Sequence, residues 1–289
     1  MRQYKTRACA KLNLYLGVQP RRADGYHDLS TVFQTVDVCD QVSLTVHDRG
    51  GISLKCNWPY LPTDSRNLAF RAAELFFAHS GKENPGIYIN IKKEIPVGAG
   101  MAGGSTDAAA VLQLLNRAFG YPLCKKDLLA LGLQLGADVP FCLLGGTMLA
   151  EGVGEKLSPL PDLPDCGIVV CKPNFSVATK KAYELFDNGP IQPEPGVDKM
   201  RQALEAGDLN TLCANLFNSL EAPVVEAYPA IGTLVARLQG LGALGARMTG
   251  SGAACFGIWA TVEEARTAAE EMRKHCGTVF VATPVKHVR

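Results

Sequence analysis

The chain has 289 residues, of which 47% are hydrophobic and 20% are charged, a composition typical of a soluble globular protein with room for two hydrophobic cores. Lys plus Arg number 29 and Asp plus Glu number 28, so no overall electrostatic field favours nucleic acid or an anionic membrane surface. No apolar run approaches the ~20 residues needed to span a bilayer. We therefore expect neither a nucleic-acid partner nor a membrane partner.

The first residues and the cysteines bear on the compartment. Residues 1–5 lead directly into a strand-like segment, which leaves no room for a signal or transit peptide and predicts a cytoplasmic protein. The ten cysteines are scattered, and no C-x-x-C pair occurs among them. Several lie in apolar runs, as Cys142 does, where a buried thiol behaves as a small hydrophobe. We expect neither a structural zinc site nor a disulfide framework.

The first half of the chain alternates between strand and helix patterns. Residues 11–18 have period-two alternation, which predicts a half-buried strand with Lys11 and Asn13 on one face. The remaining strand-like runs are 42–46, 52–56 and 87–92, with a Gly50–Gly51 turn between the first two. Helices are predicted from residue 68, over 105–119 and over 127–135.

Glycines and prolines between residues 145 and 173 mark the most probable domain junction, near 150–165. We accordingly divide the chain into domains 1–155 and 156–289. The second half contains a strand-like run at 168–171, a glycine turn at 250–252 and a last strand-like run at 279–284. Helical stretches are expected around 199–220, 228–239 and 263–275. Whether residues 279–284 return to the first domain stays open.

The segment 96–107 is the most informative part of the sequence, because it places four glycines within positions 98–104 between a strand and a helix. Glycine permits positive φ angles and lets the main chain approach a ligand without a Cβ. The following helix directs its free N–H groups and its positive dipole end at the same place. The pattern predicts a phosphate-binding loop.

Several other loops share parts of this pattern. Gly98, Gly100 and Gly103 form G-x-G-x-x-G, but the alternating strand before it is not the continuous apolar strand of a dinucleotide fold. The lysine of a P-loop is missing, and so are the H-R-D and D-F-G strings of protein kinases. A plain strand-to-helix connection needs only one or two glycines.

Two charged residues lie where burial is expected. Lys11 is inside a leucine-backed strand, and Asp138 lies between a helix-ending glycine and Val139-Pro140. From the residues alone, Lys11 is more readily an exposed edge lysine, and Asp138 is equally well a loop carboxylate that caps nearby N–H groups. His27 is most readily a turn histidine.

The sequence resembles the GHMP (galacto-, homoserine, mevalonate, phosphomevalonate) kinase superfamily nearly from end to end, and within it the kinases that act on a cytidine-diphosphate-linked methylerythritol. Five segments carry the resemblance, in this order: Ala10-Lys11-Leu12-Asn13-Leu14, Arg22-Ala23-Asp24-Gly25-Tyr26-His27, Gly104-Ser105-Thr106-Asp107-Ala108-Ala109, Leu135-Gly136-Ala137-Asp138-Val139-Pro140-Phe141 and Thr249-Gly250-Ser251-Gly252-Ala253-Ala254-Cys255-Phe256. The glycine loop is typical of the superfamily, and the second and fourth segments narrow it to this member.

The resemblance implies a small-molecule kinase that transfers the γ-phosphate of ATP, with Mg²⁺, to the 2-hydroxyl of 4-diphosphocytidyl-2-C-methyl-D-erythritol. That step belongs to the non-mevalonate route to isoprenoid precursors. By similarity, Asp138 takes or orients the hydroxyl proton, and Lys11 holds the aspartate and stabilises negative charge on the moving phosphoryl group. Asn13, Tyr26, His27 and Tyr183 are expected to bind the substrate, with the two tyrosines stacked on the cytosine.

The resemblance also implies the ATP contacts and the fold. The implied ATP-binding residues are Pro96, Val97, Gly98, Ala99, Gly100, Met101, Ala102, Gly103, Gly104, Ser105, Thr106, Asn67 and Lys93. Relatives often have serine at position 106 and glycine at positions 99 and 102. The metal ligands are unknown, with Ser105 and Asp107 as candidates. The implied fold is a two-domain α/β (α+β) architecture: an N-terminal domain like ribosomal protein S5 domain 2 and a C-terminal ferredoxin-like domain. We expect a monomer or a weak homodimer.

Three alternatives stay open. The chain could be another GHMP kinase, acting on homoserine or mevalonate. It could be a nicotinamide oxidoreductase that uses the G-x-G-x-x-G pattern. It could also be a nucleotide-binding regulator without catalysis.

Overall fold

A computed structural model describes residues 2–23, 25–190 and 193–287. The chain forms two compact units that interleave in the sequence. The first unit comprises Met1–Ala10, Val38–Ile95 and Ala102–Leu144, and the second comprises Lys11–Asp37, Pro96–Met101 and Gly145–Arg289. The predicted division at residue 155 into consecutive domains stays a prediction.

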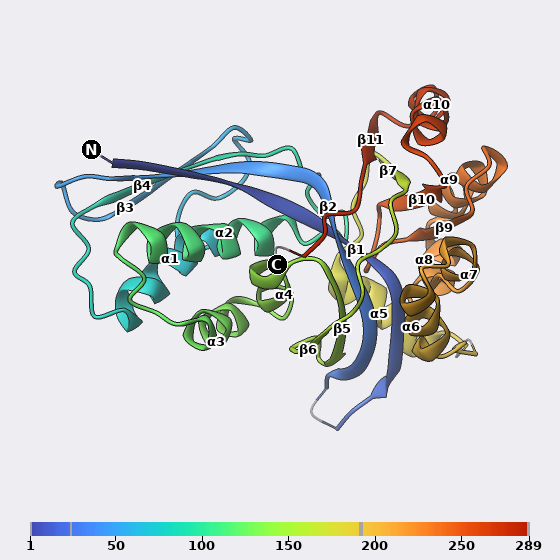
Figure 1. Cartoon of the computed structure of the whole chain (residues 1–289), viewed down its shortest axis with the longest axis horizontal. Helices are drawn as coiled ribbons and strands as arrows, with labels where there is room; N and C mark the ends of the chain where they lie inside the picture. Colours follow the sequence, from blue (N-terminus) through green and yellow to red (C-terminus); the bar gives the residue numbers. More distant parts are fainter. Residues whose placement is uncertain (1, 24, 191–192, 288–289) are drawn as a thin grey trace. The chain divides into compact units, whose positions relative to one another are not determined.

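Two long strands contribute residues to both units. β1 (Arg2–Arg21) and β2 (His27–Val46), the dark and light blue ribbons of Figure 1, are each 20 residues long. The alternation at 11–18 and 42–46 predicted only parts of them. Residues 8, 10, 12, 14, 15 and 16 of β1 are all buried, so the strand covers core on both faces in its middle.

The sheet of the first unit continues through β3 (Ile52–Cys56) and β4 (Ile87–Lys92). β4 pairs antiparallel with β2 and parallel with β3, which makes this a mixed sheet. Ile87, Ile89 and Ile91 are buried, as their alternation predicted. They face a core shared with the helices of the unit.

Those helices lie on one face of the sheet (Figure 1). Their bounds are α1 (Leu68–His79), α2 (Gly103–Ala118), α3 (Lys125–Leu135) and α4 (Val139–Leu144). α2 begins two residues earlier than predicted, directly inside the glycine loop. Its alanines 108–110 are buried and allow α2 to pack closely on α1 and the sheet.

The second unit extends the β1–β2 pair with three short strands. They are β5 (Thr147–Gly152), β6 (Lys156–Pro159) and β8 (Phe217–Asn218). β5 pairs antiparallel with residues 29–34 of β2, and β6 folds back on β5. The glycines around residue 150 therefore flank a hairpin.

A second sheet of this unit has the order β11-β7-β10-β9, with β7 (Gly167–Lys172), β9 (Gly245–Met248), β10 (Cys255–Trp259) and β11 (Thr278–Ala282). All its pairings are antiparallel. This strand order, with α10 (Val262–Arg273) before the last strand, is the expected ferredoxin-like arrangement. The last strand pairs antiparallel with β7.

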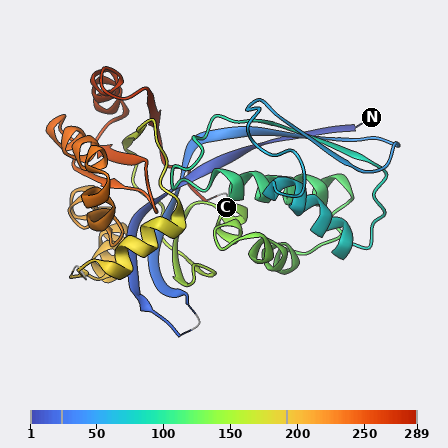
Figure 2. The same cartoon turned by 180° about the vertical axis from the view of Figure 1, so that it is seen from behind.

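The second unit has five further helices among its described residues, and some of them share a buried cluster with this sheet. They are α5 (Thr179–Asn188), α6 (Val197–Ala206), α7 (Leu209–Ala214), α8 (Glu221–Ala227) and α9 (Pro229–Gly240). α5, yellow in Figure 2, lies beside β1, and Leu16 and Val18 share a buried cluster with Ala182 and Phe186. The helical stretch predicted at 199–220 breaks at Gly207, whose left-handed φ of 65° ends α6.

One expectation about the cysteines was wrong. Cys9 and Cys39 form a disulfide between β1 and β2, and the eight other cysteines are free thiols. The two cysteines lie 30 positions apart and form no short motif, so no local pattern indicated the pair. Among the described helices, none is long and apolar enough to cross a membrane.

Candidate active site

Main-chain contacts hold much of the glycine loop between β4 and α2. In the second unit, the N–H of Lys11 donates to the carbonyl of Met101 at 3.2 Å, and the N–H of Ala254 donates to that of Ala99 at 3.3 Å. Gly98 and Gly100 have φ values of 61° and 72°. This backbone curl is what the glycine pattern predicted, and side chains would obstruct it.

Gly100 shows how tightly the loop packs. A Cβ added there would lie 2.2 Å from the carbonyl oxygen of Thr249, and one added to Gly250 would lie 2.9 Å from the carbonyl oxygen of Gly100. The two glycine segments, 150 positions apart, are thus in contact through bare backbone. The glycines of the 249–252 turn hold the loop in place.

The start of α2 belongs to the first unit and completes the predicted phosphate loop. Ala102 adopts a left-handed φ of 59°, and no side chain among the described residues caps the N-terminus of the helix. The first-turn N–H groups of this 16-residue helix and its positive dipole end therefore remain for an anion. The hydroxyl of Thr106 donates to the carbonyl of Cys9 at 2.8 Å. Thr106 thus anchors α2 through its hydroxyl, and its predicted ATP contact stays a prediction.

Lys93 lies in a buried ionic cluster beneath this helix start. Its ammonium contacts Asp40, donates to Asp107 Oδ2 at 2.7 Å and donates to the carbonyl of Gly103 at 3.1 Å. Lys93 is 6% exposed and the aspartates 0% and 4%. The predicted ATP contact of Lys93 stays a prediction, but its ammonium already fixes the main chain of the loop.

Asp40 and Asp107 complete the cluster in different ways. Asp40 Oδ1 accepts from the N–H groups of Glu94 and Ile95 at 2.6 and 2.8 Å, at the entry to the glycine loop. Burial raises the pKa of the Asp107 carboxyl, although Lys93 opposes the shift. Burial alone would lower the pKa of Lys93, but the two carboxylates outweigh burial and raise it. Asp107 Oδ1 is buried and has no hydrogen-bond partner among the described residues.

Lys11 and Asn13 share one face of β1, as the alternation predicted. The Lys11 ammonium donates to Asn13 Oδ1 at 2.6 Å and lies 4.8 Å from the ring centre of Phe33. The Asn13 amide donates in turn to the hydroxyl of Thr31 at 2.8 Å. Lys11 is 6% exposed, so it is not the edge lysine of the alternative interpretation. Buried hydrogen bonds hold its charge in a fixed place.

The expected substrate residues of the second unit are partly brought together. The rings of His27 and Tyr183 lie 5.1 Å apart, whereas Tyr26 is 65% exposed. His27 Nδ1 is 2.8 Å from the carbonyl of Gln19, and Nε2 is 3.3 Å from Asp187 on α5. No local pattern indicated Asp187, which lies on α5, 160 positions after His27. Asp24, between Ala23 and Gly25, lies outside the described residues.

Asn67 and Asp138 both lie at helix starts of the first unit. Asn67 caps α1 by accepting from the N–H of Ala69 at 2.9 Å. Asp138 precedes α4, and its carbonyl accepts from the N–H of Cys142 at 3.0 Å. Asp138 is half-buried. Lys11 belongs to the second unit and Asp138 to the first.

The mixed sheet with its glycine loop, followed by a ferredoxin-like sheet, defines a class of small-molecule kinases. The model of the GHMP kinases N terminal domain matches residues 67–146, and that of the GHMP kinases C terminal domain matches residues 200–278. The chain belongs to the GHMP kinase family.

Relatives narrow the class. A 4-diphosphocytidyl-2-C-methyl-D-erythritol kinase of Clostridium botulinum (strain Eklund 17B / Type B) is 42% identical over 96% of this chain and 99% of its own length. One of Caldicellulosiruptor saccharolyticus is 41% identical over 96% of this chain and 95% of its own length. A crystal structure of 4-(cytidine 5'-diphospho)-2C-methyl-D-erythritol kinase is similar with a TM-score of 0.84 and 37% identity, covering 97% of this chain and 99% of that one. Homoserine kinase from Cytophaga hutchinsonii shares the fold, with a TM-score of 0.81, 20% identity and coverage of 99% of this chain and 96% of its own.

Proposed function

We propose that this GHMP kinase transfers the γ-phosphate of ATP to the 2-hydroxyl of 4-diphosphocytidyl-2-C-methyl-D-erythritol, giving the 2-phosphate and ADP in the non-mevalonate isoprenoid pathway. The observation that carries the proposal is the 42% identity, over 96% of the chain, to a kinase of that name. Homoserine and mevalonate kinases share the fold at 20% and 17% identity, which supports no choice of acceptor.

In the proposed reaction Lys11 and Asp138 both act on the acceptor hydroxyl. The Asp138 carboxylate takes or orients the hydroxyl proton, and the Lys11 ammonium stabilises charge on the acceptor oxygen and the transferred group. What supports this role for Lys11 is its burial and its bond to Asn13, because a fixed cation in a site shielded from water stabilises a transition state without reorganising.

The ATP phosphates are proposed to lie on the glycine loop and the first turn of α2. Support comes from the uncapped helix start and from the left-handed backbone at Gly98, Gly100 and Ala102. Mg²⁺ in such sites is held by one or two carboxylates and the substrate phosphates, and it neutralises phosphate charge during transfer. Ser105 and Asp107 would hold it, since Asp107 Oδ1 is a buried oxygen without a hydrogen-bond partner among the described residues.

The cytidine is proposed to lie between aromatic side chains of the second unit. The rings of His27 and Tyr183 lie 5.1 Å apart at a tilt of 37°, and Tyr26, 65% exposed, is proposed to stack on the base with Tyr183. Stacking of this kind contributes ~1–3 kcal/mol per base. Asn13 is proposed to bind the sugar-alcohol end.

An acceptor panel tests the proposal. The full chain with Mg-ATP is given the cytidine substrate, homoserine or mevalonate, and ADP release is measured. We expect turnover with the cytidine substrate alone. Activity with homoserine or mevalonate would favour another GHMP kinase. ATP binding without any turnover would favour a regulator. Quenching of tryptophan emission by NADH but not by ATP would favour an oxidoreductase. Sedimentation analysis of the same preparation tests the expected monomer or weak homodimer. We further propose that the protein works in the cytoplasm.

A further inference from the structure

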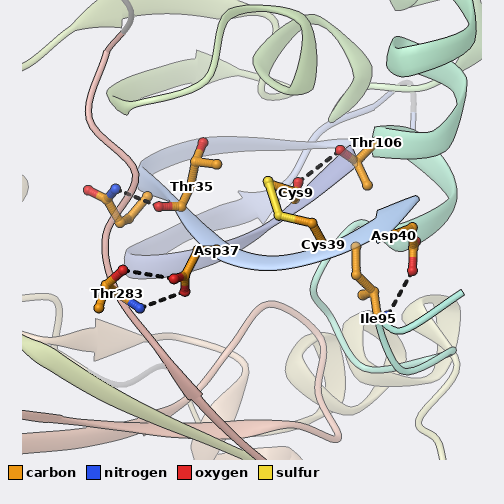
Figure 3. Close-up of a disulfide and its surroundings, with 9 residues drawn as sticks. Cys9, Thr35, Asp37, Cys39, Asp40, Ile95, Thr106 and Thr283 are labelled. Carbon is orange, nitrogen blue, oxygen red and sulfur yellow. Dashed lines mark hydrogen bonds between the residues drawn. A yellow bond between two sulfur atoms is a disulfide. The ribbon is translucent and has the colours of Figure 1, made fainter. Parts of the chain in front are cut away.

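The Cys9–Cys39 disulfide joins β1 and β2 beside residues that contact the start of α2 (Figure 3). On one side, the Cys9 carbonyl accepts the hydrogen bond from Thr106, in the first turn of the helix. On the other, Cys39 directly precedes Asp40 in β2. All of these residues belong to the first unit.

Asp40 transmits the position of β2 to the loop. One of its oxygens contacts the Lys93 ammonium, which donates to the Gly103 carbonyl at 3.1 Å. The other accepts from the N–H groups of Glu94 and Ile95, as the dashed line to Ile95 in Figure 3 shows. The entry to the glycine loop and its exit into α2 therefore depend on strands that the disulfide joins.

The oxidation is selective. The remaining eight cysteines are free thiols, and five of them are buried. Cys9 is half-buried, whereas Cys39 is buried.

We propose that Cys9–Cys39 is a reversible thiol modification site that sets the affinity of the phosphate loop for ATP. The inference rests on the proposed placement of ATP on this loop. A thiolate of a dithiol reductant attacks one sulfur and forms a mixed disulfide, and its second thiol displaces the protein sulfur. The reductant leaves as a disulfide, its two electrons reduce the bond, and its two thiol protons end on Cys9 and Cys39. A disulfide oxidant reverses the exchange.

Reduction removes the covalent link between β1 and β2 beside both anchors. The Thr106 and Lys93 contacts then hold less firmly, and ordering the loop around the phosphates costs more free energy. We expect the KM for ATP to rise about fivefold, the factor that corresponds to about 1 kcal/mol, a usual net contribution of one hydrogen bond. The kcat changes less than about twofold, because Lys11 and Asp138 are untouched.

The test compares the full-length protein before and after dithiothreitol, with the thiol count read by alkylation and mass. ATP affinity is measured twice, by ADP release with the cytidine substrate and by direct ATP binding without acceptor. Cys9→Ser and Cys39→Ser should both keep the weaker affinity and no longer respond to dithiothreitol. Cys124→Ser removes an exposed free thiol and should respond like the unaltered chain.

Three results would overturn the inference: equal ATP affinity in the two verified thiol states, a response that persists in Cys9→Ser, or ten alkylated thiols after treatment with a disulfide oxidant. The comparison of the unaltered protein in two redox states needs no variant to fold. Absence of turnover together with redox-dependent ATP binding would remove the proposed acceptor and leave this inference standing.

Discussion

Burying an ammonium group costs free energy unless fixed neighbours compensate for the lost water. Lys11 has a hydrogen bond to Asn13 and a cation–π contact with the ring of Phe33. Thr31 orients Asn13 in turn, since its hydroxyl accepts from the amide at 2.8 Å and donates to the carbonyl of Tyr15 at 2.5 Å. These bonds hold the ammonium in a fixed place, as the proposed role of Lys11 in the reaction requires.

Replacing either proposed catalytic residue should affect turnover and not nucleotide binding. Lys11→Ala and Asp138→Ala are each expected to lower kcat at least ~100-fold with the KM for ATP within about twofold, because both groups act on the transition state. Steady-state ADP release measures both constants. Lys55→Ala, on an exposed strand position, is the control. Unaltered turnover in both variants would exclude them from the mechanism.

Tyr26 is expected to act in substrate binding alone. Tyr26→Ala should raise the KM for the cytidine substrate about tenfold or more, since a stacking partner contributes ~1–3 kcal/mol, with the KM for ATP unchanged. Tyr121→Ala is a matched control, because the two tyrosines are 65% and 67% exposed. If the two variants had the same KM for the cytidine substrate, Tyr26 would have no part in recognition.

For single residues, the sequence predicted which side chains share a strand face better than it predicted which distant side chains they contact. That Lys11 and Asn13 share a face follows from the period of a strand. That Lys93 contacts Asp40 and Asp107 does not, because the partners are 53 and 14 positions away and belong to different elements. Local patterns carry no information about such contacts. The Cys9–Cys39 pair was missed because its two residues are also far apart in the sequence.

The glycine loop is the element whose conformation the sequence determines most strictly. Its carbonyls at Ala99 and Met101 are hydrogen-bonded to other main chain, and Gly100 has no room for a side chain. The conformation of the loop therefore depends on the neighbouring main chain as well as on its own residues. A substitution can test this without removing any functional group.

Gly100→Ala should destabilise the chain by at least ~2 kcal/mol, because both the left-handed φ and the contact with the Thr249 carbonyl oppose a Cβ. Gly51→Ala isolates the first cause: its φ is 77° and its added Cβ meets nothing within 4 Å. That control should lose only about 1 kcal/mol. Urea unfolding measures both, and equal losses would show that the approach to Thr249 is unimportant.

Element types followed from the sequence, but element lengths did not. Alternation in 87–92 matched β4, whereas β1 and β2 extend far beyond their alternating parts. The middle of β1 is buried on both faces although residues 11–18 alternate, because Lys11 and Asn13 on the polar face are buried as well.

Each unit of the molecule has its own buried core, built on strands of which two are shared. Glycine and proline content cannot reveal units that interleave in the sequence, because a chain that crosses between units within a strand needs no linker. The resemblance of the motifs supplied the fold class that local patterns lacked. The strand order β11-β7-β10-β9 agrees with it.

Separate cores predict separate local stabilities. Phe76 is 0% exposed in the core of the first unit, so Phe76→Ala should cost ~3–5 kcal/mol there. Hydrogen exchange should accelerate in α1 and β4 much more than in β9 and β10. Leu133→Ala, at a position 44% exposed, should change neither. Uniform acceleration throughout the chain would indicate that both cores open as one.

The backbone approach between Gly100 and Gly250 also limits how this enzyme can be redesigned. Neither position can accept even a methyl group unless the opposite segment retreats, so randomised libraries at these two sites should return only the parental residues. A change of nucleotide preference would have to come from side chains outside these two segments, with Gly100 and Gly250 left unchanged.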